Sequence, residues 1–150
     1  MPFIVRWPGV VTAGAVSEAL TSQVDLMGTI AAITGFKLPA GSAEDSHDLL
    51  PVWRDRAPSP RRSIVHNTAA TGYALRDGPW LLVAAKTGAV TRVPPWFDQE
   101  NGYKANEHPG ELYRLDEDLA QKNNLYGRMP EKVAEMTARL AAIRAQGQVR

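Results

Sequence analysis

Three short strand-like segments follow one another between residues 63 and 84, and their spacing is the strongest constraint on the fold. They are Ser63–His66, Gly72–Arg76 and Trp80–Ala84. Turn-forming residues separate them at Asn67–Thr71 and at Asp77-Gly78-Pro79, and Asp-Gly is typical of tight hairpins. The sequence therefore predicts antiparallel strands, and Glu111–Leu115 predicts one more.

The end of the chain predicts a helix that covers this sheet. Pro130 suits the first turn of a helix, and Glu131 favours the positive end of the helix dipole. An apolar stripe follows at helical spacing, formed by Val133, Met136, Leu140 and Ile143. We therefore expect an α+β fold, in which a small antiparallel sheet of about four strands packs against a helix near residues 130–146.

The beginning of the chain predicts a strand and a helix that belong to something larger. Residues 3–7 form a short apolar run before the turn-forming pair Pro8-Gly9. Ser22 and Asp25 have the spacing of a capping box, and Gly35 is placed to end the helix. Between them an apolar stripe recurs at helical spacing, formed by Leu26, Ile30 and Ile33.

Two long stretches lack a clear period. Residues 36–61 are rich in proline, glycine, serine and charge, and we expect an irregular connection that docks through Leu49–Trp53. Residues 86–110 predict a polar loop. The predicted organisation is therefore residues 1–35, a connecting loop at 36–61, and a C-terminal subdomain at 62–150.

Composition excludes several classes of function. The chain has 17 basic and 16 acidic residues without blocks of one sign, so neither a nucleic acid nor an anionic membrane is an expected partner. It has no cysteine, which removes disulfides, thiolate metal sites and cysteine nucleophiles. No apolar run approaches the ~20 residues of a membrane-spanning helix. No signal peptide is visible, which leaves the localisation open.

The residues by themselves do not predict an active site. No serine lies in a Gly-x-Ser-x-Gly elbow, and the three histidines are His47, His66 and His108. An acidic cluster at residues 44–48 matches neither calcium-loop nor zinc-ligand spacing. On these grounds alone the chain is a structural module.

Five segments together carry a more specific signal. They are Pro2–Gly9; Val24–Ile30 with Gly35; Asp45 with Leu49-Leu50-Pro51; Ala74–Leu82; and Glu111–Leu115 with Asn123-Asn124-Leu125. In this order they resemble the C-terminal third of the sulfatase (arylsulfatase) family, within the alkaline phosphatase-like superfamily. In members of the family the first segment is a strand and turn that follow Gly-Gly-x-Arg-Val. The other four have the patterns Val-Asp-Leu-x-Pro-Thr, Asp-Gly-x-Ser-Leu-x-Pro, Ala-x-Arg-x-Gly-x-(Trp/Tyr)-Lys-Leu and Glu-Leu-Tyr-Asp-Leu…Asn-Leu, in this order. The chain departs from this pattern at Gly28, Ser46, Leu81, Arg114 and Leu119, positions that look structural.

The resemblance implies a sulfuric ester hydrolase whose catalytic parts are missing from this chain. The family's nucleophile is a formylglycine made from a Cys/Ser-x-Pro-x-Arg signature, and the chain has no such segment. Calcium and formylglycine are therefore expected only in the missing N-terminal part, and we expect no catalytic activity and no metal or cofactor in this chain alone. The family is often periplasmic or secreted.

The same resemblance implies a role in lining the substrate cleft. His66, Asn67 and His108 are the polar candidates. The first strand and helix would belong to the large α/β sulfatase sheet, so we expect the edge at Phe3–Val5 and the Leu26/Ile30/Ile33 face to contact either the missing N-terminal domain or a second copy. Two alternatives stay open, namely a free-standing interaction module with the same fold and a fragment of a related phosphate- or phosphonate-ester hydrolase.

Overall fold

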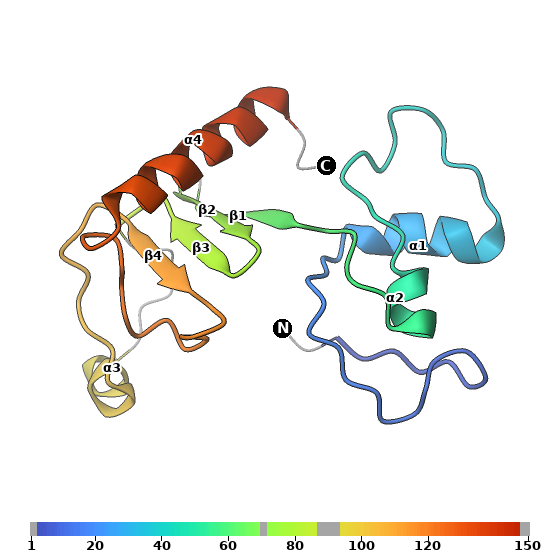
Figure 1. The fold of residues 1–150 in the computed structure, drawn as a ribbon, viewed down its shortest axis with the longest axis horizontal. Helices are drawn as coiled ribbons and strands as arrows, with labels where there is room; N and C mark the ends of the chain where they lie inside the picture. The colour runs from blue at the N-terminus through green and yellow to red at the C-terminus, as the bar shows by residue number, and fades with distance from the viewer. Residues whose placement is uncertain (1–2, 70–71, 87–93, 148–150) are drawn as a thin grey trace. The chain divides into compact units, whose positions relative to one another are not determined.

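A computed structural model describes residues 3–69, 72–86 and 94–147 (Figure 1). The chain divides into two compact units, one extending to Arg62 and the other beginning at Ser63. Residues 70–71 of the predicted turn and residues 87–93 of the predicted polar loop lie outside the described ranges.

The second unit is built on the predicted four-stranded antiparallel sheet. Its strands are β1 (Ser63–Ala69), β2 (Gly72–Asp77), β3 (Trp80–Val83) and β4 (Glu111–Arg114), in the order β1-β2-β3-β4. Strand β1 continues past its predicted end at His66, because Asn67 still pairs with Tyr73 before a bulge. Gly78 provides the positive φ, +55°, of the turn between β2 and β3.

Helix α4 (Pro130–Gln146) lies across one face of this sheet (Figure 1). Leu75, Leu82 and Leu112 lie opposite one another on adjacent strands and are almost fully buried. Met136 and Leu140 of α4 complete the core, and Val133 and Ile143 pack around it. The predicted stripe therefore forms the core, and the α+β fold class is confirmed.

Basic side chains of α4 hold both ends of the helix against the sheet. The Arg144 guanidinium lies 4.0 Å from the centre of the Tyr73 ring, and the Lys132 ammonium lies 5.3 Å from that of Trp80. Cations over aromatic faces are attracted by the ring quadrupole. Between them, Arg139 forms an ion pair with Asp77 at 3.0 Å.

The predicted polar loop before β4 contains a helix that the sequence analysis missed. Helix α3 (Pro95–Asn101) begins directly after Pro94 and ends at Gly102, which has a φ of +71°. Proline is preorganised for the first turn, and glycine tolerates the left-handed conformation at the end. The signal for this helix in the sequence was a proline at its start and a glycine at its end, on either side of the segment 95–101.

The first unit contains the predicted helix, α1 (Asp25–Thr34), which ends at Gly35 as expected. Half of the predicted capping box forms, because the backbone N–H of Ser22 donates to the Asp25 carboxylate at 2.8 Å. The buried face of α1 differs from the predicted stripe. Asp25 and Thr29 are fully buried, whereas Ile30 is 54% exposed.

The prediction of an irregular connection at residues 36–61 was wrong at Leu49–Trp53. This segment forms helix α2 (Leu50–Asp55), in which Pro51 occupies the first turn. Leu49 and Val52 are buried, so the apolar residues dock as expected, but in a helix. The island was too short to show a helical period.

The predicted strand at residues 3–7 was also wrong. These residues form no strand among the described residues. A strand needs a partner for its backbone groups, and the described residues of this unit form no strand that could pair with it. Phe3 instead lies beside Trp53, with ring centres 5.9 Å apart, while Ile4 is exposed.

Candidate functional site

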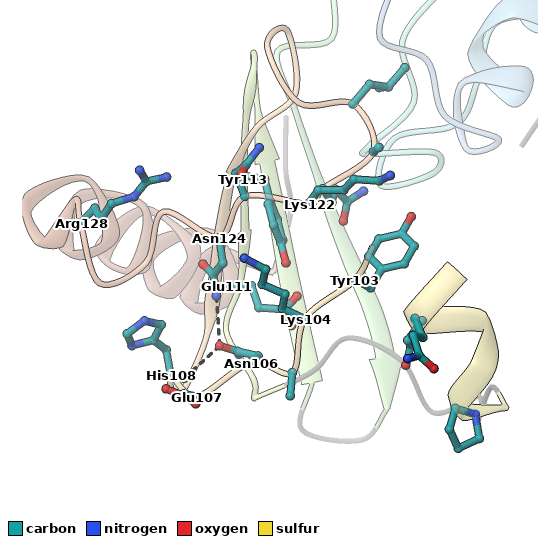
Figure 2. A pocket seen from close by; sticks show the side chains of 18 residues that line it. Tyr103, Lys104, Asn106, Glu107, His108, Glu111, Tyr113, Lys122, Asn124 and Arg128 are labelled. Carbon is teal, nitrogen blue, oxygen red and sulfur yellow. Dashed lines mark hydrogen bonds between the residues drawn. The ribbon is translucent and has the colours of Figure 1, made fainter. Parts of the chain in front are cut away.

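A polar cleft opens beside β4 in the second unit (Figure 2). Its volume is about 1380 Å³. The walls come from α3, the segment that precedes β4, the strand itself and the segment that follows it. The lining side chains that can bind a ligand through a charge, a hydrogen bond or a ring are Tyr103, Lys104, Asn106, Glu107, His108, Glu111, Tyr113, Lys122, Asn124 and Arg128.

The base of the cleft is the sheet face opposite α4. Alternate residues of a strand point to opposite faces, so Glu111 and Tyr113 lie on the other side from Leu112, which packs in the core. Tyr113 is buried and Glu111 half-buried. One face of β4 therefore lines the cleft, and its other face packs in the hydrophobic core.

The two polar groups of β4 have perturbed ionisation. Burial raises the pKa of the Glu111 carboxyl, and an interaction with the Tyr113 hydroxyl pulls it partly back down. Burial and the neighbouring Glu111 raise the pKa of Tyr113 well above its ordinary value. The phenol therefore stays protonated and can donate a hydrogen bond at any physiological pH.

Cations and an aromatic ring line the opposite wall. Figure 2 shows Tyr103, Lys104 and Lys122 around the same space as Glu111. The Lys122 ammonium lies 5.8 Å from the centre of the Tyr103 ring. Rings, both signs of charge and amides in one cleft suit a polar ligand with hydroxyl and anionic groups.

An Asn–Asn pair holds the cleft wall together. The Asn106 side-chain amide donates to the Gly110 carbonyl at 3.1 Å and accepts from the Asn124 amide at 3.0 Å. The Asn124 side-chain oxygen also accepts from the backbone N–H groups of Leu112 and Tyr126. These amides are engaged within the protein, so we assign them a structural role.

The structure separates the three predicted site residues. His108 lines the cleft and stacks on Tyr126, with ring centres 5.9 Å apart. His66 lies on the same sheet face as Glu111 but on β1, because its register partner Ala74 continues the row through Val83 to Glu111. Burial and the charge of Arg76 lower the pKa of His66.

Asn67 follows His66 on β1 and therefore points to the α4 side of the sheet. Neither residue lines the cleft. Tyr103, Lys104 and Lys122 were not predicted as site residues. The available signal for the first two was an adjacent tyrosine–lysine pair in the polar segment that precedes β4.

No cluster suited to a metal ion occurs in the described part of the chain. Within the acidic segment, the Asp48 carboxylate instead accepts a hydrogen bond from the backbone N–H of Leu50 at 2.8 Å. None of the described helices is long and apolar enough to cross a membrane.

A buried ion pair in the first unit was also missed by the sequence analysis. Arg61 donates to both oxygens of Asp25, at 2.5 Å and 2.9 Å, and both side chains are almost fully buried. Burial by itself would raise the pKa of Asp25. The hydrogen bonds from Arg61, His47 and Ser22 outweigh burial and hold this pKa below its ordinary value.

No protein-family model matches the chain, but individual proteins do. It is 30% identical over 146 residues to an N-acetylgalactosamine-6-O-sulfatase of Bacteroides thetaiotaomicron, covering 97% of this chain and 27% of that protein. It is also 30% identical over 142 residues to arylsulfatase A of Bos taurus. The chain belongs to the sulfatase family. It spans only about a quarter of the length of these relatives, and it corresponds to the C-terminal region of the family.

Solved structures agree with this sulfatase assignment. One from Bacteroides thetaiotaomicron, described in work on the metabolism of multiple glycosaminoglycans, has a TM-score of 0.72 and 26% identity. It covers 96% of this chain and 29% of that chain. A protein solved with its substrate D-glucosamine-2-N,6-O-disulfate has a TM-score of 0.67 at 20% identity, which shows the shared fold.

Proposed function

We propose that this chain forms the C-terminal part of a sulfatase and lines one wall of its substrate cleft without supplying the nucleophile or the metal site. The polar cleft beside β4 is the observation that carries the proposal. It combines the carboxylate of Glu111, on the sheet face opposite α4, with Tyr103 and two lysines from the segments before and after β4.

The proposal that this chain supplies no nucleophile rests on its sequence. Sulfate-ester cleavage in this family uses a formylglycine from a Cys/Ser-x-Pro-x-Arg segment, and the chain contains none. Calcium would be held by the same missing part. We therefore expect this chain to bind substrate and not to cleave it.

We further propose a sulfated sugar as the substrate. The similar protein from Bacteroides thetaiotaomicron is named an N-acetylgalactosamine-6-O-sulfatase. Aromatic rings pack against the apolar faces of sugars, carboxylates accept hydrogen bonds from hydroxyl groups, and lysines attract a sulfate. The lining of the cleft supplies each of these groups.

An exposed apolar face on α1 supports the proposal that this chain is one part of a larger domain. Val24, Met27 and Ile30 are more than half exposed, and Ile33 is exposed as well. Contiguous apolar surface of this kind marks an interaction site. Because the relatives are almost four times longer, we propose that the remainder of a sulfatase domain covers it.

Titration of the labelled 150-residue chain with N-acetylgalactosamine 6-sulfate, followed by NMR, tests the function. We expect shifts confined to the cleft and weaker binding of the unsulfated sugar. Lys104→Ala should weaken binding roughly three- to tenfold, and Lys37→Ala, which changes an exposed lysine of the first unit, should not. The same samples should release no product from an aryl sulfate above background.

The other outcomes distinguish the alternatives. A phosphorylated sugar that binds at least as tightly would favour a phosphate-ester hydrolase fragment. A chain that binds neither sugar would contradict the cleft-lining role and favour an interaction module. Hydrolysis that disappears with one substitution in the chain would overturn the proposal altogether.

A further inference from the structure

The His108 imidazole is seated more closely than an exposed loop side chain requires. Its ring stacks on Tyr126 with an angle of 25° between the planes. Its backbone N–H donates to the side-chain oxygen of Asn106 at 2.9 Å. Among the described residues, no hydrogen bond reaches the ring nitrogens, so they are free to meet a ligand.

Gly127 makes room for this ring. A Cβ added at Gly127 would lie 2.6 Å from Cε1 and 2.9 Å from Nε2 of His108. Gly127 is not among the glycines with a positive φ, so backbone conformation does not explain the glycine. Close approach of the imidazole does.

Gly110 makes room for the supporting ring in the same way. A Cβ at Gly110 would lie 2.5 Å from Cε2 of Tyr126 and 2.8 Å from the Val83 carbonyl oxygen. Its φ is not positive either. Two glycines without a conformational need therefore border one stacked pair of rings.

One amide pair fixes both backbones. Asn106 accepts from the N–H of His108, and Asn124 accepts from the N–H of Tyr126 at 2.9 Å. The two asparagines bond each other, as the dashed line in Figure 2 marks. The backbone positions from which the two rings extend are therefore held relative to each other.

We propose that His108 is a substrate-recognition side chain, and that Gly127 and Tyr126 are its positioning residues. This rests on the proposed function of the cleft. The oriented imidazole offers one nitrogen to an oxygen of the sugar or of its sulfate, and no bond is made or broken. Because the ring is fixed before binding, little side-chain entropy is lost when the ligand arrives.

NMR of the imidazole signals tests the positioning directly in the 150-residue chain. The protein has three histidines, so single substitutions assign the signals. We expect the Tyr126 ring current to shift the His108 signals in the wild type. Gly127→Ala must displace the ring, which as the end of a side chain can move without disturbing the backbone, and should abolish that shift.

Binding of N-acetylgalactosamine 6-sulfate provides the functional arm. Gly127→Ala and Tyr126→Leu should each weaken it about fivefold, the size of one lost hydrogen bond. Tyr126→Phe retains the ring and should retain both the shift and the affinity. The His47 signals, from the first unit, should stay unchanged in every variant if the fold is intact.

The two failures are separable. Unshifted His108 signals in the wild type, or full affinity in Gly127→Ala after the signals have moved, would overturn the positioning role. No binding of the sulfated sugar by the wild type would instead overturn the proposed function, whatever the imidazole signals show. If the variants lose as much affinity for the unsulfated sugar as for the sulfated one, the imidazole contacts a sugar hydroxyl. If they lose affinity only for the sulfated sugar, the imidazole contacts the sulfate.

Discussion

Asp25 holds the first unit together through contacts that extend far beyond its own helix. Its carboxylate accepts hydrogen bonds from the backbone N–H groups of Ser22 and His47 and from the guanidinium of Arg61. Arg61 also donates to the backbone carbonyl of Asp45. One buried charge thus joins α1, the segment before α2 and the end of the unit.

Replacing Asp25 by Asn should destabilise this unit strongly. The change leaves Arg61 buried without a counter-charge, which costs about 3–5 kcal/mol. Hydrogen exchange of the α1 amides, read by mass spectrometry, should accelerate by roughly two to three orders of magnitude. Asp55→Asn removes a carboxylate from the exposed Arg54–Asp55 pair and should leave exchange unchanged.

Acid should mimic the same substitution. The pKa of Asp25 is held below its ordinary value, so its stabilising contribution is complete above about pH 4 and is lost as the pH falls through the lower pKa of the folded state. The wild type should lose α1 protection in that range. Equal acid sensitivity in Asp25→Asn would show that another group is responsible.

At the scale of the elements, α4 and the sheet depend on a narrow contact. Met136 and Leu140 meet three leucines from adjacent strands. Arg144 and Lys132 add contacts with Tyr73 and Trp80 at the two ends of the helix. The apolar contact buries side chains completely, whereas the cations remain at the edge.

Met136→Ala should therefore weaken the second unit more than any change at the surface of α4. Truncation of a fully buried methionine costs about 2–5 kcal/mol, because the cavity closes only partly. Urea unfolding followed by circular dichroism measures the change. Thr137→Ala, at the exposed neighbouring position, should have little effect, and equal losses in the two variants would contradict the assigned core.

Elements with a long or repeated local pattern were predicted well. The four strands followed from short strand-like segments separated by turn residues, and α4 followed from a helical stripe. Helices α2 and α3 were missed because six or seven residues contain too little periodicity to separate a helix from a loop. The predicted strand at residues 3–7 was apolar but had no partner within its unit, and strands are stabilised only by pairing.

At the scale of the whole molecule, we expect association to depend on the exposed apolar residues of α1. When the 150-residue chain is purified by itself, we expect a second copy to cover Met27, Ile30 and Ile33, which are exposed in its first unit. Burial of such surface is worth about 25 cal/mol per Å² before the costs of association.

We therefore expect the purified chain to self-associate at high micromolar concentration in sedimentation experiments. Ile30→Lys should shift the equilibrium toward the monomer, because a charge would have to be desolvated in the interface. Ala32→Lys, at an exposed position on another side of α1, should not. A strictly monomeric wild type would contradict this assignment of the surface.

The sequence by itself determined what depends on neighbours along the chain. Strand-like segments and turns specified the sheet, the stripe around Met136 specified its covering helix, and Gly35 specified where α1 ends. It also placed His108 in a loop beside β4. These features follow from local backbone preferences and side-chain period, so they can be read without a tertiary structure.

Only the tertiary structure decided which distant residues meet. Asp25 lies 36 positions from Arg61, and nothing in the sequence indicates that the two residues pair. In the same way, nothing near Gly127 in the sequence says that its missing Cβ leaves room for His108. Such contacts depend on how packed elements bring remote segments together, because burial and close approach are properties of the folded chain.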